Sequence, residues 1–362
     1  MAAFARSRCC ARQLGEAVSR TPSSHTRAFH CSPPLHSSST DPRVIADAFL
    51  SKFSHGKAFT RSQLLDANQL RLFSLTLDRA SLWPGSQTSL EEAEPLEGTP
   101  IPAGYHLAYF TPTQLPGILG QDGTDASFNP DPPFTRRMWA GGGIEWPDSE
   151  NKSGNVHYLR VGDVATETTR VLSCEPKTIK RTGESMLVVG VVKEFRGSKD
   201  NLCVVDRRNW VFRGALNPKK PASIPQKPAL LSDSGMAAVE EGKIVRPFTR
   251  NAATLFRFSA LTFNAHRIHY DVRWARNVEG HRDVVVHGPM NLLSMLDMWR
   301  DERGSREGVS YPRQIDYRAT SPVYAGEGYR IMMEASGENG KSELTAVSDD
   351  GSVCMKGSIT GW

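Results

Sequence analysis

The stretch NLLSMLDMW, residues Asn291–Trp299, is apolar on nearly every side when it is read as a helix. A helix on the surface of a globular protein has one apolar and one polar face, so a helix that is apolar all round has to be enclosed by other structure. Segments typical of β-strands follow at 329–336, 342–348 and 352–359, and an Asp-Asp-Gly turn at 349–351 joins the last two. This order predicts a helix surrounded by antiparallel strands.

The first half of the chain presents a similar order of elements. Apolar residues three and four positions apart predict helices over residues 41–53 and 60–77. Segments rich in β-branched and aromatic residues then predict strands over most of residues 155–213. Helix followed by antiparallel strands, twice over, predicts the α+β class, with each half forming a sheet wrapped around a central helix.

The chain of 362 residues is long enough for two such domains. Residues 215–247 contain the segment NPKKPASIPQKPALLSDSG, whose Pro, Lys and Ser content is typical of a linker. We therefore expect an N-terminal domain over residues 41–214 and a C-terminal domain over residues 248–362. A tail at residues 1–40 precedes them.

That tail has the composition of a mitochondrial transit peptide. It holds five arginines, one glutamate and no lysine or aspartate, and it is rich in Ser and Ala. The segment RAFHCS, residues 27–32, resembles the sites at which presequences are cut, and a disordered basic tail is the alternative. Because the tail carries four of the five net positive charges, the remainder is almost neutral, which argues against a nucleic-acid partner.

Further classes of protein are disfavoured by the rest of the sequence. No apolar run approaches the length that a membrane-spanning helix requires. The three cysteines beyond residue 40 are far apart and form no CxxC pair, so we interpret them as structural thiols. His266 and His269 have an HxxH spacing, but no third ligand is evident and Arg267 would repel a cation. We therefore expect no metal and no cofactor.

Two motifs in the second half carry the side chains best suited to chemistry, FNAHRIHYD at 263–271 and VVVHGPM at 284–290. The pair resembles the MaoC-like hydratase/dehydratase family, in which a loop of the form Asp-x-Asn-Pro-x-His-x-Asp precedes a His-Gly dipeptide that opens a central helix. Together with RRMWAGG at 136–142, the first motif is similar to one branch. That branch contains the mitochondrial 3-hydroxyacyl-thioester dehydratases type 2 and the mesaconyl-CoA hydratase-like proteins.

The resemblance covers roughly residues 42–360 and implies a double hotdog in a single chain. In each hotdog an antiparallel sheet wraps around a central helix. The first hotdog, residues 41–214, would be degenerate and would help to form the substrate pocket. The second, residues 248–362, would carry the catalytic residues.

The resemblance also implies three catalytic residues. His269 takes the position of the family's catalytic histidine, and imidazole suits both removal of the C2 proton and protonation of the C3 hydroxyl of a 3-hydroxyacyl thioester. Gly288 opens the predicted helix, where a free backbone N–H can stabilise the thioester oxygen. Asn264 replaces the family's first aspartate, and its amide can hydrogen-bond a water or hydroxyl but cannot exchange a proton. Either His269 performs both transfers or a carboxylate from elsewhere assists.

The predicted substrate-binding residues are Arg136, Arg137, Trp139, Asp271 and His287. Arg136 or Arg137 would meet the phosphates of CoA or of the phosphopantetheine arm, because guanidinium geometry suits phosphate. The alternative is a strand with charged flanks in which Trp139 belongs to the core. Asp271, which closes the family motif, would also brace its loop.

We interpret the chain as a hydro-lyase of the mitochondrial matrix that dehydrates 3-hydroxyacyl thioesters, with acyl-carrier protein or CoA as the carrier, in mitochondrial fatty-acid synthesis. One alternative is a CoA hydratase for a branched dicarboxylate such as mesaconyl or itaconyl. Another is a non-catalytic protein that binds acyl thioesters, with Asn264 as the sign of lost catalysis. A hotdog thioesterase is disfavoured because hydrolysis needs a carboxylate in this loop. The sequence is compatible with a homodimer.

Overall fold

The computed structural model describes residues 41–53, 57–86, 88–147, 157–180, 182–220, 222–303, 309–334 and 340–361. These belong to one compact unit, Ser39–Trp362. The predicted transit peptide, residues 1–40, lies outside the described residues, so it stays a prediction. None of the helices in the described part of the chain is both long and apolar enough to span a bilayer.

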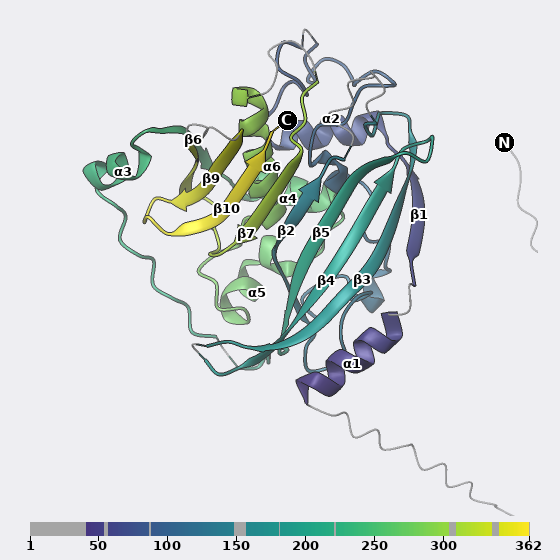
Figure 1. The fold of residues 1–362 in the computed structure, drawn as a ribbon. Helices are drawn as coiled ribbons and strands as arrows, with labels where there is room; N and C mark the ends of the chain where they lie inside the picture. The colour runs from purple at the N-terminus through teal and green to yellow at the C-terminus, as the bar shows by residue number, and fades with distance from the viewer. Residues whose placement is uncertain are drawn as a thin grey trace, which may run out of the picture. The chain divides into compact units, whose positions relative to one another are not determined.

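A single antiparallel sheet runs through both halves of the chain (Figure 1). Within the described residues its order is β1-β3-β4-β5-β2-β7-β10-β9-β8-β6. The halves join where β2 pairs with β7, from Gly141 opposite Arg318 to Glu145 opposite Gln314. Each half therefore covers one edge of the other's sheet. The strands are β1 (Phe59–Leu64), β2 (Arg136–Glu145), β3 (Val164–Thr178), β4 (Ser185–Arg196), β5 (Leu202–Arg213), β6 (Lys243–Thr249), β7 (Gln314–Ala319), β8 (Gly328–Glu334), β9 (Lys341–Ser348) and β10 (Val353–Thr360).

The helix predicted from NLLSMLDMW is confirmed as α6, Gly288–Arg303. Every residue from Met290 to Arg300 is buried, and α6 packs against β8, β9 and β10. Asp297 is the buried acid of this helix, and it accepts a hydrogen bond from Tyr105 Oη at 3.0 Å and lies 2.9 Å from Arg300. Pairing of this kind is what allows charged side chains to occupy a buried helix.

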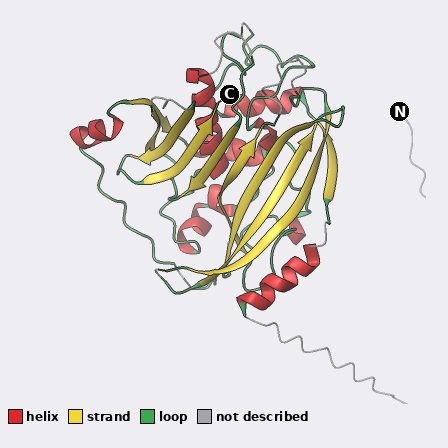
Figure 2. Cartoon of the chain, in the orientation of Figure 1, coloured by secondary structure: helices red, strands yellow, loops and turns green. Residues whose placement is uncertain are grey.

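The other helices are shorter than α6 (Figure 2). They are α1 (Pro42–Phe53), α2 (Ala67–Thr76), α3 (Asp233–Glu240), α4 (Ala252–Leu261) and α5 (Val272–Asn277), with 3-10 turns η1 (Tyr105–Ala108), η2 (Pro116–Ile118) and η3 (Arg267–His269). In the described first half, neither α1 nor α2 is buried on all sides. Neither of them is therefore enclosed as completely as α6. Instead α1 packs on β3 and β4 and forms a second, smaller core there.

The helix expected over residues 60–77 is also wrong in its first part. The segment FTRSQL alternates half-buried and exposed positions and pairs with β3 as strand β1. Asp66 then caps α2, because its carboxylate accepts a hydrogen bond from Gln69 N at 2.7 Å. Pairing with a strand far along the chain outweighs the local pattern.

Residues 215–247, predicted as a linker, contain the helix α3 and most of strand β6, which pairs with β8. The described residues between β5 and α3 form no helix or strand. The placement of two domain boundaries at this segment stays a prediction.

Candidate active site

The loop between α4 and α5 is fixed at both ends by its own residues. Phe263 has a positive φ of 48°, which turns the chain sharply after α4. Asn264 then donates its backbone N–H to Ser259 O at 2.8 Å. At the other end Asp271 caps α5 by accepting from Trp274 N at 3.0 Å, and it pairs with Arg267 at 2.7 Å. The loop therefore presents η3 in one defined position.

His269 at the end of η3 is placed as a base. Its Nδ1 lies 2.7 Å from the carbonyl oxygen of Val285, and because a carbonyl only accepts, Nδ1 carries the proton. The lone pair is then on Nε2. Burial, followed by the charge of His266, lowers the pKa of His269 to about 3. The ring is therefore neutral near pH 7 and able to accept a proton.

His287 supports His269 from behind. The two imidazole rings stack with centroids 3.6 Å apart and an interplanar angle of 18°. His287 Nε2 lies 2.9 Å from Ser259 Oγ, and burial and the neighbouring His269 lower its pKa well below the usual range. Two stacked rings that both stay neutral hold each other without charge repulsion.

Gly288 opens α6 at the same place. A Cβ on this residue would lie 2.5 Å from Trp139 Cε3, so no side chain fits there. Among the described residues, the Gly288 N–H donates to no protein acceptor. An unpaired N–H at the start of a helix is a donor with a favourable dipole behind it.

Gly288 and His269 line the same cavity, whose volume is about 1070 Å³. The second half of the chain contributes its polar reacting groups, which include Asn264. The side-chain oxygen of Asn264 accepts from the backbone N–H of His266 at 3.1 Å, so its NH₂ group is left as a donor. The first half contributes an aromatic wall that reaches α1, formed by Phe53, Phe59, Phe110, Phe128, Trp139 and Trp210.

Another wall of the cavity is charged. Lys193 donates to Glu167 Oε1 at 3.0 Å, and Arg61 lies 3.2 Å from the same oxygen. Arg208, on the neighbouring strand, lies 2.6 Å from Asp206. Burial, followed by the charge of Arg208, lowers the pKa of Lys193 to about 8. These groups give the wall a polar surface that could meet a polar or anionic group.

The arginines of β2 are held by acids. Arg136 Nε lies 2.8 Å from Glu279 Oε2. The Arg137 guanidinium stacks 5.0 Å from the Trp210 ring and lies 3.9 Å from Asp125. Both residues line the cavity. Their predicted contact with phosphate stays a prediction, because the structure shows them paired inside the protein.

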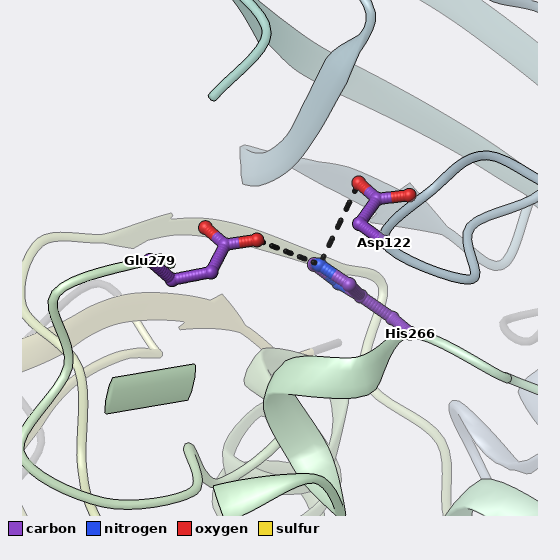
Figure 3. A group of neighbouring side chains, drawn as sticks. All are labelled: Asp122, His266 and Glu279. Carbon is purple, nitrogen blue, oxygen red and sulfur yellow. Dashed lines mark ion pairs between the residues drawn. The ribbon is translucent and has the colours of Figure 1, made fainter. Parts of the chain in front are cut away.

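His266 lies between two carboxylates, as Figure 3 shows. Its Nε2 is 3.8 Å from Asp122 Oδ2 and 3.8 Å from Glu279 Oε1, which is too long for direct hydrogen bonds. Burial raises the pKa of Glu279, but His266 and Arg136 outweigh it and lower the value to about 2. The three ligand atoms lie within 4.8 Å of one another, a spacing that a cation could also use. The Arg136 guanidinium opposes a second cation at Glu279, and the absence of a metal stays a prediction.

The comparisons with known proteins place this site in a family. A family model described as hydroxyacyl-thioester dehydratase type 2 matches residues 104–325, more than half of the chain. The chain belongs to this family. The mesaconyl-C(4)-CoA hydratase of Chloroflexus aurantiacus is 28% identical over 267 residues, which cover 73% of this chain and 85% of the relative. The mitochondrial hydroxyacyl-thioester dehydratase type 2 of Schizosaccharomyces pombe is 24% identical over 280 residues, covering 72% and 87%.

A solved structure shows the same fold. The MaoC-like dehydratase from Phytophthora capsici matches with a TM-score of 0.56 at 14% identity, over 84% of this chain and 95% of that chain. The double hotdog predicted from the sequence is confirmed. Membership of the hydroxyacyl-thioester dehydratase type 2 family also confirms the predicted class of enzyme, a hydro-lyase.

The cavity brings together six of the eight residues predicted for the dehydratase site: Asn264, His269, Gly288, Arg136, Arg137 and Trp139. Asp271 and His287, predicted to bind substrate, lie outside the cavity wall. The first caps α5, and the second packs behind His269.

Sequence reasoning missed three side chains of the site, Asp122, Glu279 and Lys193. Asp122 lies in GQDGTD, which is a turn by its composition, and Glu279 follows α5 without any motif. The one available signal was a lysine placed directly after an apolar run within a strand, since Lys193 follows SMLVVGVV.

Proposed function

We propose that this hydro-lyase converts 3-hydroxyacyl thioesters to trans-2-enoyl thioesters and back in the mitochondrial matrix, with the acyl chain on acyl-carrier protein in fatty-acid synthesis. One observation carries the proposal: the lone-pair nitrogen of His269 and the free N–H of Gly288 belong to one cavity. A base and an oxyanion donor on a shared cavity are what proton removal next to a thioester carbonyl requires.

The chemistry follows from these positions. His269 Nε2 removes the C2 proton, and the Gly288 N–H stabilises the negative charge that develops on the thioester oxygen. The C3–O bond breaks as the C2=C3 double bond forms, and the departing oxygen leaves as water after it gains a proton. The NH₂ group of Asn264 can donate a hydrogen bond to that oxygen, which orients it without supplying a proton.

The first half of the chain would receive the acyl chain. Its aromatic wall offers an apolar surface beside Trp139, which closes against Gly288 and so lies next to the reacting carbonyl. The mitochondrial location is supported by the arginine-rich tail and by the S. pombe relative, whose name places it in mitochondria.

Hydration of crotonyl-CoA by the purified protein tests the function directly. His269→Gln should lower kcat by about 10²–10⁴, the range typical of a group that performs acid/base catalysis. His157→Gln, outside the cavity, is the matched control. A His269→Gln variant that keeps turnover within a few-fold of the wild type would remove His269 from the mechanism.

A second candidate, hydration of a dicarboxylyl-CoA such as mesaconyl-CoA, is favoured by the charged wall. Lys193 and Arg208 could pair with the carboxylate of such a substrate. Comparison of kcat/KM for mesaconyl-CoA and crotonyl-CoA separates the two candidates. A strong preference for mesaconyl-CoA would favour this second reaction over a role in fatty-acid synthesis.

A further inference from the structure

Elimination of water needs two proton transfers, and the residues assigned so far account for one. His269 removes the C2 proton, whereas Asn264 can only donate a hydrogen bond. A second group that exchanges protons should therefore line the same cavity, close to His269. A side chain of that kind would complete the reaction that we propose above.

His266 meets this description. It lines the cavity, and its ring lies edge-on to the His269 ring, with centroids 5.5 Å apart and an interplanar angle of 83°. Its Nε2 is buried and makes no hydrogen bond within the described residues, where it faces Asp122 and Glu279. With Nε2 turned toward the carboxylates, Nδ1 is the nitrogen that is available to substrate.

The two carboxylates are themselves held in place. The side chain of Glu279 is 3% exposed, and it is fixed by Arg136 at 2.8 Å and by Trp274 Nε1 at 3.1 Å. Asp122 Oδ1 accepts hydrogen bonds from Thr124 N at 3.0 Å and from Thr124 Oγ1 at 2.7 Å. At 3.8 Å neither carboxylate makes a direct hydrogen bond to Nε2, but their negative charges stabilise the imidazolium of His266, so that its other nitrogen can exchange protons.

We propose that His266 is the second proton-transfer group of this hydro-lyase and that Glu279 and Asp122 are the positioning residues that hold it. The inference rests on the proposed function. It assigns to a histidine the role that Asn264 cannot perform, and it gives the buried carboxylates beside the cavity a purpose in the reaction.

The step balances as follows. His269 Nε2 takes the C2 proton, and the electrons of the C2–H bond form the C2=C3 double bond. The C3–O bond breaks with its electron pair on oxygen, and the imidazolium of His266 gives that oxygen its Nδ1 proton, so that water leaves. His269 has then gained one proton and His266 has lost one. Exchange with water in the cavity returns both to their starting states, and hydration is the reverse sequence.

The experiment separates the two transfers. Exchange of the C2 hydrogen of butyryl-CoA in D₂O reports on His269 alone, because this thioester has no C3 hydroxyl to lose. Dehydration of 3-hydroxybutyryl-CoA requires both groups. For His266→Gln we expect dehydration to fall by about 10²–10³ while C2 exchange stays within a few-fold. For His269→Gln we expect both to be lost.

Glu279→Gln gives an independent measurement with the cavity side of His266 intact. The groups that face His266 are Asp122, Glu279 and His269, with Arg136 and His281 beyond them. A neutral amide stabilises the imidazolium less than a carboxylate does. The dehydration rate of Glu279→Gln should therefore fall at a lower pH than that of the wild type, with C2 exchange unchanged. Glu175→Gln, which removes a carboxylate on the surface and outside the cavity, is the matched control.

Several results would overturn the inference. If His266→Gln dehydrates at the wild-type rate, His266 is not the proton donor to the C3 oxygen. If the variant loses C2 exchange and dehydration equally, His266 only positions His269. Loss of wild-type activity in EDTA and its return with Zn²⁺ would make Asp122, His266 and Glu279 a metal site. A wild-type protein that neither exchanges nor dehydrates any of these thioesters would instead refute the proposed function.

Discussion

Gly288→Ala probes the contact on which the oxyanion donor depends. The added methyl group would lie 2.5 Å from Trp139 Cε3 and 2.8 Å from Cζ3. Carbon atoms pack at about 3.5 Å or more, so the ring or the start of α6 has to move by about 1 Å. The Trp139 ring cannot swing aside freely, because it stacks on the buried Tyr317 with centroids 4.7 Å apart and an interplanar angle of 22°.

A displacement of that size at the reacting carbonyl has a known order of cost. Misplacing a reacting group by about 1 Å lowers the rate by about 10²-fold, which corresponds to about 2.7 kcal/mol of transition-state stabilisation. We expect Gly288→Ala to lower kcat for crotonyl-CoA by about this factor. The fold should persist, because α6 is anchored by its buried face from Met290 to Arg300.

Steady-state kinetics of four proteins checks the reasoning: the wild type, Gly288→Ala, Gly117→Ala and the double variant Gly288→Ala/Trp139→Leu. Gly117 has open space around its Cβ position, so it is the matched glycine control. The smaller leucine should relieve the clash and restore at least part of kcat. If Gly288→Ala turns over at the wild-type rate, the close approach to Trp139 has no catalytic meaning. If the double variant is no faster than the single one, the steric argument fails.

Three further predictions concern the whole chain. Residues 1 to about 30 should direct import into mitochondria and be removed, because they hold five arginines and one acid. N-terminal sequencing of the native protein checks this, and an intact Met1 would contradict it. Burial, followed by the charge of His266, lowers the pKa of His269 to about 3 from 6.5, so the unfolded chain binds its proton at higher pH. The free energy of unfolding should then fall as pH drops from 6.5 toward 3, by up to about 1.4 kcal/mol per unit for this group, and urea unfolding of His269→Gln should show a smaller slope. A fragment of residues 245–362 should be neither stable nor active, since β7 would lose its partner β2; a folded, active fragment would refute that.

Local sequence determined the elements whose conformation depends only on a pattern within about a dozen consecutive residues. The residues of NLLSMLDMW are apolar on all sides, and α6 is buried throughout this stretch. β4 and β5 follow from runs of β-branched and aromatic residues, and the hairpin between β9 and β10 follows from its Asp-Asp-Gly turn. The motif FNAHRIHYD likewise located His269, because its neighbours on both sides build the loop.

Tertiary structure decided every feature that depends on a distant partner. FTRSQL became strand β1 because it forms backbone hydrogen bonds with β3. The helix-like spacing of its apolar residues gives no information about that distant partner. In the described part of the first half, no helix is enclosed as completely as α6, and the sheet there meets α1 and the cavity. Backbone pairing and burial are gained only when the strands come together, so a local pattern cannot weigh them.

The same reason separates the two parts of the site. His269 and Gly288 belong to the short motifs FNAHRIHYD and VVVHGPM, so the residues next to them in the sequence are enough to predict a loop histidine and a glycine at a helix start. Asp122 and Glu279 meet His266 only because the turn between η2 and β2 and the segment after α5 come together beside it. From the sequence alone, a carboxylate in a turn is predicted to be exposed to solvent. Folding buries it beside a histidine, where the dielectric constant is low and its charge has a stronger effect.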